Sequence, residues 1–147
     1  MHTVTPDELF RKGLDALANG NTIPALASFE KALELEDNPS VYSYFALCIA
    51  KERGQVRKAI ALCEEAMQKD TANTAHYLNL GKILLHAGKR DDAIMVFRGG
   101  LQYGIDPLII DELNRLGTRK PPVIPFLKRS NPINKYLGII LNRLGLR

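Results

Sequence analysis

The sequence predicts an all-α fold, a solenoid of three helical hairpins followed by a capping helix and a C-terminal amphipathic helix. Two observations carry this prediction. The segments 24–35, 58–69 and 92–103 superimpose with a constant offset. This repeat offset separates Ala25 from Ala59 and Ala59 from Ala93. A constant period of this kind is typical of stacked helical repeats. Each segment also places small and aromatic residues at spacings that fall on one face of a helix.

The repeated segments share four columns of residues. Small residues in the first and third columns let neighbouring helices approach closely, while the second, mostly aromatic column fills the space beside them. A glycine stands five residues before the first column, where the chain must turn and a positive φ is needed. The columns are Ala25, Ala59 and Ala93; Phe29, Cys63 and Phe97; Ala32, Ala66 and Gly100; and Gly20, Gly54 and Gly88.

A second helical pattern precedes each of these glycines. It is most regular in the third copy, where Tyr77, Leu80, Leu84 and Leu85 recur at i, i+3, i+7 and i+8. The segments between the copies contain Asp, Asn and Pro, which turn the chain and cap the next helix. We therefore expect hairpins at about 6–39, 40–73 and 74–106.

These residues resemble the tetratricopeptide repeat family, whose unit is a pair of helices with small and aromatic residues at fixed positions and a length that equals the offset seen here. The resemblance implies a right-handed solenoid over residues 1–106. The chain departs from the family pattern at Cys63, which replaces the aromatic, and at Leu47, which replaces the glycine present as Gly13 and Gly81. The early tryptophan of the family is replaced by Leu9, Ser43 and Tyr77.

Members of this family usually bind peptides or helices in a concave groove lined by the first helix of each hairpin. The resemblance therefore implies a protein-interaction scaffold, an adaptor or assembly component, and not an enzyme. The corresponding residues are mostly apolar, which favours an amphipathic helix of a partner or of the chain itself. They are Phe10, Leu14, Leu17, Tyr44, Cys48, Lys51, Leu78, Lys82 and Leu85.

Some family members instead grip a terminal carboxylate with a clamp of lysine and asparagine side chains. This mode is not expected here, because Asn79 is the only side chain at the clamp positions that is even partly suitable. The clamp positions hold Phe10, Leu14, Phe45, Ala75 and Asn79.

The positive charge of the chain is concentrated at its end. Residues 1–104 have 12 Lys and Arg against 13 Asp and Glu, a balance of −1, whereas 115–147 have eight basic residues and no acidic one. Asp106 and Pro107 predict a short capping helix over 107–117. Prolines then favour an extended strap over 118–131, and a basic amphipathic helix is expected over 132–147.

The apolar face of this last helix must be buried against something. We expect it to pack on its own hairpins, while docking with a partner, self-association through this helix, and binding to anionic membrane or nucleic acid are weaker alternatives. A peripheral membrane or nucleic-acid tether is therefore the alternative function. The basic residues that would serve it are Arg119, Lys120, Lys128, Arg129, Lys135 and Arg143.

No catalytic residue, cofactor site or metal site is predicted. His76 and His86 have no Cys or second His at metal-ligand spacing and are expected at the surface or in the groove. Cys48 and Cys63 are too few for a disulfide framework, which favours a reducing, cytoplasmic location. No stretch is long and apolar enough to span a membrane, and the first residues lack a signal-peptide pattern.

Overall fold

The computed structural model describes residues 2–117, which form seven helices and no strand. The predicted all-α solenoid of hairpins is confirmed, whereas the predicted strap and the terminal helix lie outside the described residues. The helices are α1 (Pro6–Ala18), α2 (Thr22–Leu35), α3 (Pro39–Arg53), α4 (Val56–Lys69), α5 (Thr74–His86), α6 (Arg90–Gly100) and α7 (Pro107–Arg115).

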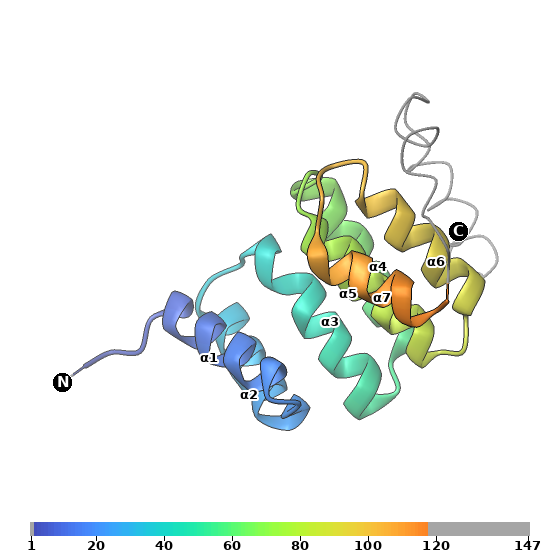
Figure 1. Cartoon of the computed structure of the whole chain (residues 1–147). Helices are drawn as coiled ribbons and strands as arrows, with labels where there is room; N and C mark the ends of the chain where they lie inside the picture. Colours follow the sequence, from blue (N-terminus) through green and yellow to red (C-terminus); the bar gives the residue numbers. More distant parts are fainter. Residues whose placement is uncertain (1, 118–147) are drawn as a thin grey trace.

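The hairpins α1–α2, α3–α4 and α5–α6 stack in chain order (Figure 1). The second helix of each hairpin packs against the helix that follows it, so α2 contacts α3, α4 contacts α5 and α6 contacts α7. The first helices α3 and α5 also pack closely against each other. By this rule α7 occupies the place of the first helix of a fourth hairpin.

The two helices of a hairpin begin in different ways. Side chains of Thr5, Asn38, Asn73 and Asp106 accept hydrogen bonds from the first turns of α1, α3, α5 and α7. No such side-chain cap is present at α2, α4 and α6, which follow tight turns inside the hairpins. The glycines of these turns have φ of 76°, 66° and 78°, which confirms the predicted turn column.

Packing in the core explains why Leu47 and Cys63 depart together from the repeat pattern. A Cβ atom added to Gly13 or Gly81 would lie 2.3 Å or 2.0 Å from the ring of Phe29 or Phe97, so each phenylalanine fills the space above a glycine. The equivalent positions of the second hairpin hold Leu47 and Cys63, and both are buried. The first helix therefore supplies the volume there, and the two replacements compensate each other.

Candidate functional site

The first helices carry the residues predicted to line a groove. These positions recur with the repeat offset along α1, α3, α5 and α7, which places them on one side of the successive first helices. We call it the first-helix face. Its half-buried and exposed residues are Phe10, Leu14, Leu17, Tyr44, Lys51, Lys82, Leu85 and Glu112.

One end of the first-helix face is aromatic. The ring of Phe10 contacts the ring of Tyr44 edge-on, with 5.5 Å between centroids. Both rings rest on the fully buried Phe29, at centroid distances of 6.0 Å and 5.8 Å. Phe10 and Tyr44 are themselves half-buried, so part of each ring faces solvent. This end therefore offers a firmly supported apolar surface.

The other end of the first-helix face is charged. Lys82 of α5 is half-buried, and this burial lowers the pKa of its ammonium group. Glu112 of α7 opposes the shift, while Lys51 of α3 and Arg115 of α7 add to it by repulsion. The Glu112 carboxylate pairs with Arg115 at 3.6 Å and not with Lys82. An ammonium group thus lies partly desolvated beside a carboxylate that already has a partner.

Two of the predicted groove residues are not available on this surface. Cys48 is fully buried and Leu78 is 4% exposed, so the structure places both in the core. Cys48 lies on α3, which is enclosed by α2, α4 and α5, and Leu78 lies on α5, which packs against α3, α4 and α6. Burial also raises the pKa of the Cys48 thiol to about 12, so this cysteine is not a reactive thiolate.

The prediction overlooked the contribution of α7 to this face. Glu112 and the half-buried Leu116 follow Leu78 and Lys82 by the same offset that relates the other first helices. The signal was present in the sequence, because the repeat offset continues beyond the third hairpin. The face therefore extends over four helices.

Packing and polar bonds hold α7 in place. Ile109 and Leu113 are fully buried, and Ile109 lies next to Gly100 of α6. Asp106 accepts a hydrogen bond of 2.7 Å from the Thr74 hydroxyl of α5. The guanidinium group of Arg90 donates to the backbone oxygen of Leu116 at the other end of α7. The helix is thus fixed at both ends as well as along its apolar side.

The histidines and the clamp position differ in their exposure. His86 is exposed, but the expectation that His76 lies at the surface or in the groove is wrong, because its side chain is fully buried. Asn79, the one partly suitable clamp residue, is also buried and donates to the Ser43 hydroxyl at 3.0 Å. It is therefore directed away from any ligand on the first-helix face.

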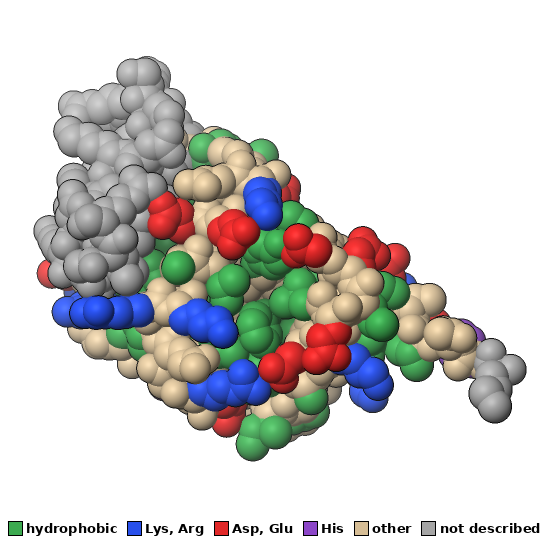
Figure 2. All heavy atoms as spheres, turned by 180° about the vertical axis from the view of Figure 1, so that it is seen from behind, with side chains coloured by type: hydrophobic (Ala, Val, Ile, Leu, Met, Phe, Trp, Pro, Cys, Tyr) green, Lys and Arg blue, Asp and Glu red, His purple; other side chains and the backbone are tan. Residues whose placement is uncertain are grey.

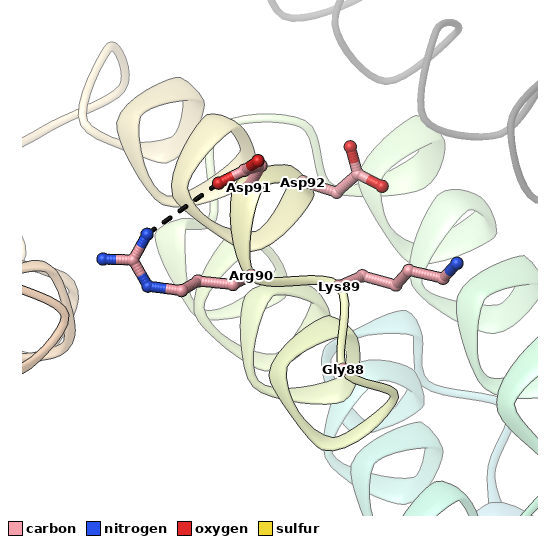
Figure 3. Close-up of a pocket in the computed structure, with 5 residues that line it drawn as sticks. All are labelled: Gly88, Lys89, Arg90, Asp91 and Asp92. Atoms are coloured by element: carbon pink, nitrogen blue, oxygen red, sulfur yellow. Dashed lines mark ion pairs between the residues drawn. The ribbon is translucent and has the colours of Figure 1, made fainter.

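A pocket of about 490 Å³ lies at the turn between α5 and α6, lined by Gly88, Lys89, Arg90, Asp91 and Asp92. Figure 3 shows Lys89 and Asp92 extending to one side, while Arg90 pairs with Asp91 at 3.8 Å on the other. Within residues 2–117 no group of three or more His, Cys, Asp or Glu could hold a metal ion. The mixed charge of this pocket indicates no particular ligand.

The face of the molecule that points away from the viewer in Figure 1 carries both apolar and charged side chains. Figure 2 shows hydrophobic side chains there lying between acidic and basic ones. The most exposed large apolar residue of the second helices is Ile23 of α2, with 69% of its surface in contact with solvent.

Over the described part of the chain, no helix has both the length and the apolar character needed to cross a membrane.

The fold and the first-helix face define an α-solenoid of helical hairpins. Residues 50–103 match the family model described as tetratricopeptide repeat. This match and the shared fold support the assignment of the chain to the tetratricopeptide repeat family. A comparison with curated proteins finds no match.

Three solved structures share the fold. The Sgt2 tetratricopeptide repeat domain from Aspergillus fumigatus is 22% identical, with a TM-score of 0.60 and 76% of each chain covered. The Arabidopsis OM64 domain is 22% identical, with a TM-score of 0.58 and coverage of 76% of this chain and 93% of that one. The second such domain of human RPAP3, solved with the HSP70 peptide SGPTIEEVD, is 16% identical, with a TM-score of 0.55 and coverage of 78% and 99%.

Proposed function

We propose that this protein is an interaction scaffold that binds a peptide or amphipathic helix of a partner protein on its first-helix face. The observation that carries the proposal is that the paired rings of Phe10 and Tyr44 and the partly desolvated Lys82 all stand on the first helices. Supported aromatic surface and a few placed charges are the features that recognise a helix laid along a groove. The RPAP3 domain, which has the same fold, was solved with a bound peptide.

The two ends of the face define the chemistry of the partner. Apolar side chains of the partner would cover Phe10, Leu14 and Tyr44, whose burial on binding is favourable. None of the ion pairs among residues 2–117 includes Lys82. A carboxylate of the partner placed there would offset the desolvation of this ammonium group. We therefore propose an amphipathic segment that is acidic at the end facing Lys51 and Lys82.

An enzymatic role is not proposed. Tetratricopeptide repeat proteins are generally non-enzymatic scaffolds. Of the nucleophilic side chains near the first-helix face, the Cys48 thiol has a raised pKa and the Ser43 hydroxyl is fully buried. Neither group meets the need of a nucleophile for activation and for access to a substrate.

A displayed library of helical peptides, selected on the full-length protein, tests the proposal. We expect the selected sequences to be amphipathic, with acidic residues near one end. Leu14→Glu should weaken binding of the best peptide by roughly tenfold or more, because it places a charge in the apolar contact. The matched control is Ile23→Glu, which adds the same charge to the exposed Ile23 of α2 and should leave the affinity unchanged.

Different results would contradict the binding site and the acidic character of the partner. Selection of no peptide, or equal losses for Leu14→Glu and Ile23→Glu, would remove the first-helix face as the binding site. Selection of amphipathic peptides without acidic residues, or binding that Lys82→Glu does not weaken, would keep the face and discard the acidic partner. Thermal unfolding of each variant must show that it remains folded at the assay temperature.

The tether function remains the alternative. Its residues, Arg119, Lys120, Lys128, Arg129, Lys135 and Arg143, lie outside the described part of the chain, and so does the helix proposed for self-association. Salt-sensitive binding of the full chain to anionic vesicles or oligonucleotides, abolished when these six residues are changed to glutamine, would favour this alternative over the scaffold.

A further inference from the structure

A chain of hydrogen bonds, buried at Ser43 and His76, joins the second hairpin to the third. The Ser43 Oγ atom lies 2.7 Å from His76 Nδ1 and accepts a hydrogen bond of 3.0 Å from Asn79 Nδ2. On the other side of the ring, His76 Nε2 lies 3.1 Å from Asp70 Oδ2. The same carboxylate oxygen accepts a hydrogen bond of 2.9 Å from Asn73 Nδ2. The chain thus links α3, the turn before α5, and α5 itself.

One placement of protons satisfies every member of this chain. An ionised Asp70 can only accept, so His76 Nε2 must carry the proton that it donates. In the neutral ring Nδ1 is then an acceptor, and it receives the hydroxyl proton of Ser43. The Ser43 oxygen in turn accepts from Asn79. Donors therefore point in one direction from Asn79 through Ser43 and His76 to Asp70.

These residues have the chemical types of a Ser-His-Asp catalytic triad, but their setting differs. Ser43 and His76 are fully buried, so a substrate has no access to the hydroxyl or the ring. Asp70 has 39% of its side chain in contact with solvent, so the carboxylate end of the chain is the one that water reaches. The arrangement therefore suits a structural role that responds to protons.

We propose that this chain is a proton-sensitive latch between the second and third hairpins, which opens when His76 is protonated. A protonated ring carries hydrogens on both nitrogens, so Nδ1 would become a donor to Ser43. The Ser43 oxygen would then receive two donors, and its own hydrogen would lose the acceptor it had. A positive charge would also stand in a fully buried ring, compensated by Asp70 on one side alone.

The charges around the ring set the direction of the effect. Burial lowers the pKa of His76 below its usual value of 6.5, and Asp70 only partly opposes this shift. From α3 the ring meets the uncharged Ser43, and from the turn before α5 it meets Asp70, whose partner there is Asn73. On its own helix, Asn79 contacts the same hydroxyl. Among the described residues, Asp70 is the charged group that acts on the ring.

The sign of the pH dependence follows from this depressed pKa. As the pH falls below 6.5, the unfolded chain binds a proton at His76 before the folded protein does, so folding becomes less favourable. The stabilisation is present above this pH and is lost as the pH falls through the lower pKa of the folded state. The pKa of Asp70 is also lowered, mainly by Asn73, but its effect appears only below the usual value of 3.8.

Opening of the latch would also change the first-helix face. The α3 side of this face carries Tyr44 and Lys51, and the α5 side carries Lys82 and Leu85. A looser contact between α3 and α5 would alter the spacing of these two pairs. Weaker peptide binding in mildly acidic solution follows from the latch only if the proposed binding function is correct; the effect on stability does not depend on it.

Urea unfolding of the full-length chain between about pH 7.5 and about pH 5 tests the latch. The folding equilibrium constant of the wild type should fall severalfold over this range. His76→Gln, which cannot bind a proton, should lose much less. The matched control is His86→Gln, because His86 is an exposed histidine on the same helix, and it should behave as the wild type does.

Ring-nitrogen NMR of the labelled wild type gives a second, independent reading that does not require any variant to fold. We expect His76 Nδ1 to be unprotonated near neutral pH and to become protonated below the usual histidine pKa. An Nδ1 that carries the proton at neutral pH would overturn the proposal. The same pH dependence of stability in the wild type and in His76→Gln would overturn it as well.

Discussion

Gly81→Leu is expected to lower the free energy of unfolding by about 3 kcal/mol, and Phe97→Cys in the same chain is expected to restore most of the loss. The reason is steric, because a Cβ atom on residue 81 would lie 2.0 Å from the Phe97 ring. Phe97→Cys alone should cost about 3 kcal/mol as well, by leaving a cavity. The double variant reproduces the pair Leu47 and Cys63 that the second hairpin already contains.

Urea unfolding of the wild type, the two single variants and the double variant measures the coupling between these positions. Ala27→Leu, which adds similar volume at an exposed position of α2, is the control and should change stability little. A double variant as unstable as the sum of the single variants would show that the two positions do not share one space. The explanation given for Leu47 and Cys63 would then be wrong.

Leu113→Ala is expected to cost about 3 kcal/mol of unfolding free energy, because Leu113 is fully buried where α7 packs on the third hairpin. Loss of this anchor should also expose the α6–α7 connection to protease, because the apolar side of α7 would lose part of its contact with the third hairpin. Thermal or urea unfolding and limited proteolysis measure both effects. The change would further displace Glu112 from the charged end of the first-helix face.

The control for this prediction lies on the same helix. Leu108 is 58% exposed, so Leu108→Ala removes the same atoms from a side chain that contributes little burial. It should alter stability by less than about 0.5 kcal/mol. Equal effects of the two substitutions would mean that α7 is not docked through its apolar side, and the extension of the face onto α7 would have to be withdrawn.

Much of the fold could be predicted from local spacing. The turn glycines, such as Gly54 and Gly88, and the buried column of Ala25, Ala59 and Ala93 follow from the constant repeat offset and from the geometry of a helix. These features depend on a spacing that recurs along the chain, so the spacing alone carries the information.

The candidate site could be predicted only in part. Phe10, Tyr44 and Lys82 lie on the first-helix face as expected for their repeat positions. Cys48 and Leu78 occupy equivalent positions but are buried, because the depth of a residue depends on how closely its helix, α3 or α5, is packed by its neighbours. The spacing of a sequence defines the side of a helix, but it does not define the distance to the next helix.

The sequence by itself determined the repeat, the hairpins and their turns, because each of these depends on spacings that recur along the chain. The tertiary structure alone decided which side chains meet between helices. Ser43 and His76 are 33 residues apart and meet at 2.7 Å, and Leu47 compensates for Cys63 on the neighbouring helix. Such pairs form only when separate helices pack together, since burial and proton position depend on the partner that packing brings into contact.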